Sequence, residues 1–221
     1  MIAYLLLFML MSPQPQPYCG KIVVQRYWID DVLALGKNGH ELHEIEPPIL
    51  TKEKAKEIAM EVVGKLARKL GCLEPKLEEC KREVSSKQEL AIRGGETWRV
   101  SFSLWYKGIR IDDGMGVAVT RRKVFPWYGC FYKVIHDDKC KSCKRISKSE
   151  AEKILWGSVK LSDDAKAKLI PPELVWNYNC YRPNEKNVLM PYWKDMQAEW
   201  EGGIPDMIFY CDGSVIPEFV N

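Results

Sequence analysis

The sequence predicts an α+β fold of two repeated units, each with one helix packed on a three- to four-stranded antiparallel sheet. Three observations indicate it: a helix with a single apolar stripe, strands of alternating apolar residues after it, and a shorter recurrence of the same order. A helix stripe and a strand face that are both apolar bury each other when they pack in two layers. The 221 residues are enough for two such units.

The first helix is predicted to begin after Thr51 and to end at Gly71. Thr51 is a favourable N-cap, and the carboxylate of Glu53 suits the positive end of the helix dipole. Glycine often follows a helix because it adopts the left-handed conformation without strain. Apolar residues recur at helical period along one stripe: Ala55, Ile58, Ala59, Val62, Val63, Leu66 and Leu70.

The strands of the first unit are indicated by β-branched and aromatic residues in alternation. The clearest is 97–106, in which Trp98, Val100 and Phe102 alternate with Arg99 and Ser101. Asp112-Asp113-Gly114 predicts a turn. A strand over 21–29 is expected before the helix, and the strands expected after it, joined as an antiparallel meander, are 97–106, 109–111, 115–120 and 124–135.

The second unit repeats this order with a shorter helix. Ser147 and Glu150 form a capping box at its start, and Ser147 corresponds to Thr51 as Trp193 corresponds to Trp98. This correspondence indicates a divergent internal duplication. The apolar face of the helix comprises Ala151, Ile154, Leu155 and Val159, and the expected strands are 174–181, 192–200, 204–211 and 214–219.

The N-terminus has the character of an export signal. Ile2 to Met11 is an apolar run, too short to cross a bilayer but typical of the apolar core of a signal peptide. A Pro/Gln spacer follows it. We therefore expect a signal peptide and spacer over 1–18, a first unit over 19–146, a second over 147–221, no membrane span in the mature chain, and a secreted or cell-envelope location.

The cysteines are even in number, which together with export favours disulfides. All eight are expected to take part: Cys19, Cys72, Cys80, Cys130, Cys140, Cys143, Cys180 and Cys211. Cys72 and Cys80 bracket a loop that contains Pro75, which suggests a local pair. Cys180 and Cys211 follow aromatic-rich strands, and we predict a disulfide between them. Cys140 and Cys143 form a C-x-x-C, for which a redox or zinc role is an alternative to a structural disulfide.

The order of helix, Trp-x-Val strand and Asp-Gly-x-Val hairpin resembles the PepSY-like domains and thermolysin-type protease propeptides, often found in tandem. The resemblance covers about 50–135 and 147–218. It implies a secreted or membrane-tethered protein that binds or inhibits peptidases and does not catalyse with its own residues. The matching residues are Thr51, Ala55, Ala59, Trp98, Val100 and Gly108, then Ser147, Ala151, Tyr192, Trp193, Asp212, Gly213 and Val215.

The residues that carry chemistry favour binding over catalysis. His40 and His43 are three positions apart in a loop, which does not match the helical zinc box. Neither a phosphate loop nor a Ser/His/Asp set occurs in the sequence, so no cofactor, metal or enzymatic activity is expected. In Phe125-Pro126-Trp127-Tyr128-Gly129, proline and glycine are expected to break the strand and expose the rings of Phe125, Trp127 and Tyr128 as a partner contact.

The charge balance also bears on the partner. The 33 basic residues against 30 acidic ones lack the excess typical of nucleic-acid binding, so a protein or peptide partner is expected, an extracellular peptidase being one class. The sequence thus predicts a secreted, non-enzymatic binding or regulatory protein. Two alternatives stay open: a cell-envelope structural component that self-associates through sheet edges, and a zinc or thiol-redox protein that uses the C-x-x-C.

Overall fold

The computed structural model describes residues 20–34, 40–41, 50–82, 97–121, 123–140, 145–157, 170–178, 187–194, 207–211 and 215–216. The described helices are α2 (Ile29–Ala34), α3 (Lys52–Leu70) and α5 (Lys148–Gly157). The described strands are β1 (Gly20–Trp28), β2 (His40–Glu41), β3 (Pro75–Arg82), β4 (Trp98–Tyr106), β5 (Ile109–Val119), β6 (Lys123–Lys139), β7 (Glu173–Tyr178), β8 (Val188–Lys194), β9 (Met207–Phe209) and β10 (Val215–Ile216).

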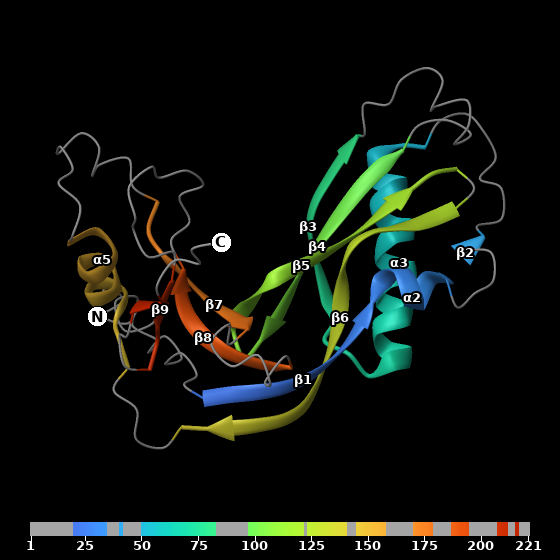
Figure 1. Cartoon of the computed structure of the whole chain (residues 1–221). Helices are drawn as coiled ribbons and strands as arrows, with labels where there is room; N and C mark the ends of the chain where they lie inside the picture. The colour runs from blue at the N-terminus through green and yellow to red at the C-terminus, as the bar shows by residue number, and fades with distance from the viewer. Residues whose placement is uncertain are drawn as a thin grey trace, which may run out of the picture.

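These strands form one continuous 10-stranded sheet (Figure 1). Its order is β10-β9-β8-β1-β6-β5-β4-β3, with β2 paired to β6 and β7 paired to both β5 and β8. All of these pairs are antiparallel except β5 with β7, which is parallel. The sheet is therefore mixed. Among the helices of the described residues, none is long and apolar enough to cross a membrane.

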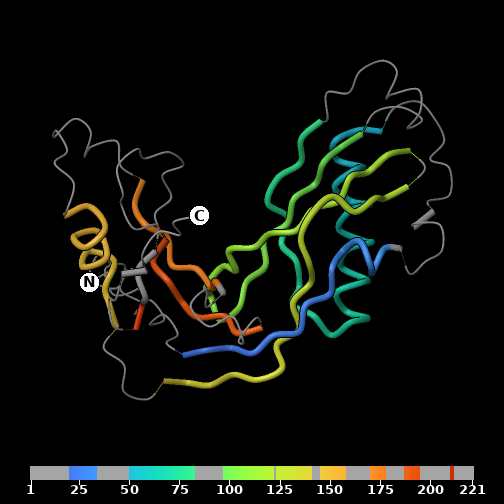
Figure 2. The backbone as a smooth tube through the Cα atoms, viewed as in Figure 1, coloured from blue at the N-terminus to red at the C-terminus, as the bar shows by residue number. Residues whose placement is uncertain are grey.

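The predicted fold of two repeated helix-on-sheet units is wrong, because one strand joins both halves into a single sheet. β1 pairs along its whole length with β6, and its Ile22 and Val23 pair with Leu189 and Val188 of β8. β1 runs beside the second half of β6, and it passes from the part of the sheet that contains β8 to the part that α3 covers (Figure 2). The helices are also unequal: α3 packs on β3, β4, β5 and β6, whereas α5 contacts β9.

The prediction for the first helix is confirmed. The Thr51 side chain accepts a hydrogen bond from the Lys54 backbone N–H at 3.2 Å, and Gly71 ends α3 with φ of 66°. The backbone N–H of Gly71 also donates to the carbonyls of Ala67 and Arg68. The hydrogen bonds at the two ends satisfy backbone groups that a helix end leaves unpaired. The buried residues of α3 are Ala55, Ile58, Ala59, Val62, Val63, Gly64 and Ala67, which form one core with the strands beneath them.

Two features predicted as loop or turn are strands. Pro75–Arg82 is the edge strand β3, and only Pro75 and Cys80 within it are buried, so its sequence lacks apolar alternation. Asp112-Asp113-Gly114 does not reverse the chain; it lies inside β5 as an irregularity, since Phe102 pairs with Met115 but Leu104 pairs with Ile111. The extra residues are accommodated because both aspartates find partners on other strands.

One local contact occurs at both helix starts. The indole N–H of Trp98 donates to the Leu50 carbonyl at 2.8 Å, and that of Trp193 donates to the Ile146 carbonyl at 2.9 Å. Leu50 directly precedes Thr51, the N-cap of α3, and Ile146 directly precedes Ser147, the residue before α5; both side chains are buried. Each tryptophan thereby ties a helix N-terminus to the sheet. The two helix starts share this contact, although both lie on one continuous sheet and the helices contact different strands.

We predict that Trp98→Phe lowers the free energy of unfolding by about 1–3 kcal/mol, because it leaves the buried Leu50 carbonyl without its donor. Urea unfolding followed by circular dichroism measures this. Trp28→Phe is the control, because Trp28 is 52% exposed and its change should stay within about 0.5 kcal/mol. Equal unfolding midpoints for the two variants would contradict the role given to the Trp98 contact.

Candidate binding face of the sheet

One face of β3–β6 is covered by α3, and the opposite face, here called the open face, carries the candidate site. Trp98 contacts the start of α3, so its strand neighbour Arg99 points to the opposite side. Cross-strand partners share a face: Arg99 pairs with Ala118, and Ala118 pairs with Phe125. Phe125 therefore lies on the open face.

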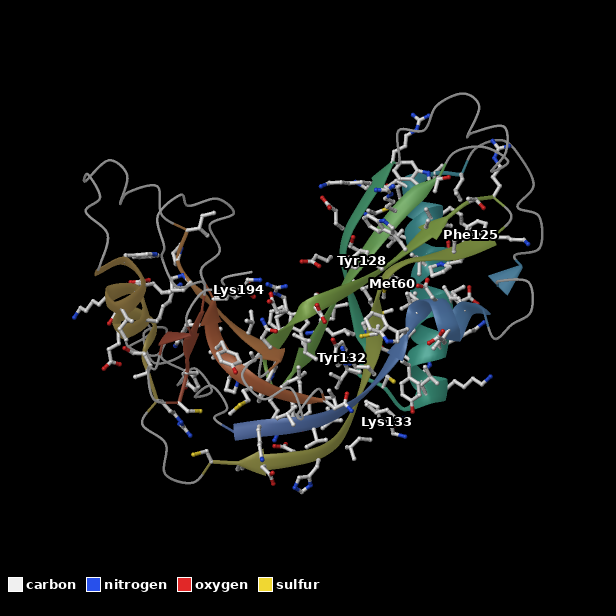
Figure 3. All side chains as sticks on the ribbon, viewed as in Figure 1. Met60, Phe125, Tyr128, Tyr132, Lys133 and Lys194 are labelled. Atoms are coloured by element: carbon white, nitrogen blue, oxygen red, sulfur yellow. The ribbon has the colours of Figure 1, made fainter. Side chains whose placement is uncertain are left out.

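The three aromatic residues predicted as a partner contact lie on this face and form what we call the aromatic platform. Phe125 and Trp127 are each 40% exposed, and Tyr128 is 38% exposed. Figure 3 shows Phe125 and Tyr128 along β6, with Met60 on α3. The expected strand break is wrong, because β6 continues through Pro126 and Gly129. Exposure instead follows from the uncovered face and from a register shift beside Trp127.

The rings of Trp127 and Tyr128 are held in place by contact with a glycine. Their centroids lie 4.8 Å apart at an interplanar angle of 84°, an edge-to-face arrangement. A Cβ atom on Gly116 would lie 2.5 Å from the Tyr128 ring and 2.8 Å from the Trp127 ring. The rings thus occupy the space that any other residue at position 116 would fill. Preorganised aromatic side chains lose little conformational entropy when a partner binds.

Basic side chains stack on the indoles of the open face. The Arg99 guanidinium carbon lies 4.6 Å from the centroid of Trp127, and the Lys76 amine lies 5.3 Å from that of Trp105. The Trp105 indole N–H donates to Ser103 Oγ at 3.0 Å. Such cation–π pairs add attraction and keep a cation beside each ring. Sequence reasoning did not single out Arg99, Lys76 or Gly116, although strand alternation does place Arg99 opposite Trp98.

A second polar cluster lies where β5 meets β7 and β8. Arg110 binds Glu173 through two hydrogen bonds of 2.9 Å, and this bonding raises the pKa of Arg110. The Lys194 amine lies 2.8 Å from Asp112, whose carboxylate also accepts from the Asn177 side chain at 2.9 Å. Each charge has an opposite partner, as partly buried charges require. This cluster therefore joins the two halves of the sheet.

Three of the cysteines expected in disulfides are free: Cys72, Cys80 and Cys130. The suggested Cys72–Cys80 pair is wrong because β3 runs back along α3. Cys72 follows the C-terminal end of the helix, whereas Cys80 Sγ lies 3.9 Å from the carbonyl of Lys52 at its start. A disulfide needs Cα atoms within about 7 Å, and a helix of 19 residues is far longer than that.

The other cysteines and histidines bear less on the site. Cys211 takes part in a disulfide, and Cys180, its predicted partner, lies outside the described residues together with Cys19 and Cys143. Cys140 is exposed.

His40 pairs with Val124 between β2 and β6, and His43 also lies outside the described residues. Within the described ranges there is no group of three or more His, Cys, Asp or Glu side chains arranged to hold a metal.

No family model, curated protein or solved structure matches this chain. The chemistry of the open face is therefore the basis for the function proposed below.

We predict that Gly116→Ala lowers the free energy of unfolding by about 1–3 kcal/mol and displaces Trp127 and Tyr128, because the new methyl group overlaps both rings. Urea unfolding and near-ultraviolet circular dichroism measure the two effects. Gly64→Ala is the matched control: its Cβ would lie 3.5 Å from Arg68, and it should stabilise α3 by about 0.5–1 kcal/mol. If Gly116→Ala leaves both measurements unchanged, the glycine does not position the rings.

We also predict that the thiols of Cys72, Cys80 and Cys130 resist alkylation in the folded protein at pH 8. Burial raises the pKa of all three, that of Cys72 to about 11, so little thiolate is present. Alkylation before and after unfolding, with two distinguishable reagents and peptide mapping, checks this. A peptide linked by Cys72 and Cys80 would refute the prediction, and the same map tests the Cys180–Cys211 pairing.

Proposed function

We propose that this protein is a non-enzymatic binding protein that recognises a protein or peptide partner through the aromatic platform of Phe125, Trp127 and Tyr128. The observation that carries this proposal is the exposure of three large aromatic side chains on a sheet face that α3 does not cover. Exposed aromatic clusters on a rigid support are typical of interaction sites.

The support of the platform strengthens the proposal. Trp127 and Tyr128 contact each other and the backbone at Gly116, and Arg99 stacks on Trp127. The rings are therefore presented in one arrangement before a partner arrives. A strand of a ten-stranded sheet is also a stiffer support than a loop, which favours a specific contact over an adaptable one.

The resemblance to PepSY-like and thermolysin-type propeptide domains makes an extracellular peptidase the first partner class to test. The composition of the edge strand β3 argues against the alternative, which is self-association through sheet edges. The strand begins with Pro75 and carries Lys76, Lys81 and Arg82, and prolines and charges of this kind protect edge strands against pairing.

We predict that the purified protein forms a complex with at least one member of a panel of secreted metallopeptidases, and that Trp127→Ala weakens it at least tenfold. Truncation of a central aromatic residue commonly costs 2 kcal/mol or more, which corresponds to such a factor. Binding is measured by surface plasmon resonance, and inhibition by substrate cleavage.

The control for this experiment is Met60→Ala, since Met60 is 41% exposed but belongs to α3, on the other side of the sheet. It should leave binding unchanged. Complexes that survive Trp127→Ala and Tyr128→Ala, or that Met60→Ala weakens equally, would show that the platform is not the contact. The absence of any complex across the panel would exclude the peptidase class.

A further inference from the structure

We infer that the aromatic platform receives the proline-rich segment 12–18 of a second copy of this chain. The inference rests on the proposed function, because it takes the platform as the contact and names what occupies it. Its basis is the arrangement and hydrogen-bonding character of two platform rings, together with a segment of matching chemistry in the same sequence.

The rings of Trp127 and Tyr128 stand at right angles to each other. Their interplanar angle is 84°, and their exposed fractions of 40% and 38% leave apolar ring surface available to a partner. Exposed aromatic side chains of this kind are the surface on which proline-rich segments dock. Such segments bind at low entropic cost because their polyproline II conformation is already formed before contact.

Both rings also present a hydrogen-bond donor. Over the ranges that the structure describes, neither the indole N–H of Trp127 nor the hydroxyl of Tyr128 makes a hydrogen bond with another residue. By contrast, the indole N–H groups of Trp98, Trp176 and Trp193 donate to backbone carbonyls. The platform thus supplies donors, and a proline-rich backbone supplies acceptors, because proline has a carbonyl but no N–H.

The chain itself carries a segment with this chemistry. Residues 12–18 read Ser-Pro-Gln-Pro-Gln-Pro-Tyr, with no charged side chain and proline at every second position. A polyproline II helix has three residues per turn, so Pro13, Pro15 and Pro17 point to three different sides of it. Whichever side faces the platform, one proline ring therefore meets the aromatic side chains.

The segment is too short to reach the platform of its own chain. β1 begins at Gly20, directly across from Lys139, and Tyr128 lies eleven positions before Lys139 on β6. At about 3.3 Å per residue this path is about 36 Å long, and β6 bends along it without folding back (Figure 2). From Pro15 to Gly20 the chain spans at most about 18 Å, and from Pro17 less. A second copy must therefore supply the segment.

The contact makes copies associate head to tail. Each copy offers its segment to one neighbour and receives on its platform the segment of another, so the two sides of the interface are different surfaces. This mode of self-association does not use the sheet edges, and the charges of β3 do not oppose it.

Sedimentation velocity of the full chain, as exported, tests this arrangement after its intact mass has confirmed that residues 12–18 are present. The wild type should associate more strongly as its concentration rises. Trp127→Ala should remain monomeric, and so should the triple variant Pro13→Ala, Pro15→Ala, Pro17→Ala. An equimolar mixture of these two variants should form dimers of one copy of each, because one contributes an intact segment and the other an intact platform.

A synthetic peptide of residues 12–18 isolates the contact. Its binding to the triple proline variant, measured by fluorescence anisotropy, should weaken about tenfold when Trp127→Ala is added, and about three- to tenfold with Tyr128→Phe, which removes only the hydroxyl donor. Lys65→Gln, on the exposed side of α3, is the matched control and should leave the affinity unchanged. The same peptide with alanine in place of its prolines should bind about tenfold more weakly. Circular dichroism confirms that each variant is folded.

The outcomes separate this inference from the proposed function. A wild type that stays monomeric and binds no peptide would overturn the inference, while a peptidase complex that depends on Trp127 would leave the binding platform in place. Peptide binding without the mixed dimer, association that survives Trp127→Ala, or an exported chain that begins after Tyr18 would each overturn the assignment to a second copy. Loss of neither peptide nor peptidase binding in the platform variants would overturn both proposals.

Discussion

The pairing of β1 with two neighbours at once is the constraint on which the rest of the structure depends. Its backbone groups bond to β6 along one edge and to β8 at Ile22 and Val23 along the other. Buried N–H and C=O groups must be paired, so β1 fixes the distance and register between the two halves. Because β8 is held there, β7 can reach β5 and pair with it in parallel.

The same arrangement determines where charges can be buried. Arg110 and Asp112 of β5 face Glu173, Asn177 and Lys194 only because β7 and β8 lie beside β5. In the sequence alone, these charged and polar residues do not differ from those typical of an exposed surface. Once the sheet is continuous they become a partly buried set in which each charge is matched, as partly buried charges require.

The open face follows from a shortage of covering elements. Within the described residues α3 covers one face of β3–β6, and the other side of these strands carries small residues, rings and cations. Gly116 allows two rings to lie against the backbone, which keeps the surface flat and the side chains ordered. Ordered aromatic rings with charged side chains beside them present a chemically defined surface, which suits a binding role.

Sequence patterns predicted features whose causes are local. The predicted helical stripe, of which Ala55 to Val63 are buried, the Thr51 cap and the Gly71 terminus depend on residues within a few positions of each other. Alternation in 97–106 gave the correct strand, and the aromatic cluster at 125–128 is exposed as expected. The same local reasoning missed β3, because an edge strand with two buried residues carries no alternation to detect.

Local sequence patterns were thus sufficient to predict α3, the central strands and the residues of the aromatic platform. Long-range pairing decided the rest: β1 between β6 and β8, the irregularity at Asp112-Asp113-Gly114, and the separation of Cys72 from Cys80 along α3. The physical reason is that a strand's sequence specifies which side chains face the core but not which backbone will bond to its edges. Neighbours far apart in the chain are chosen only when the whole sheet assembles.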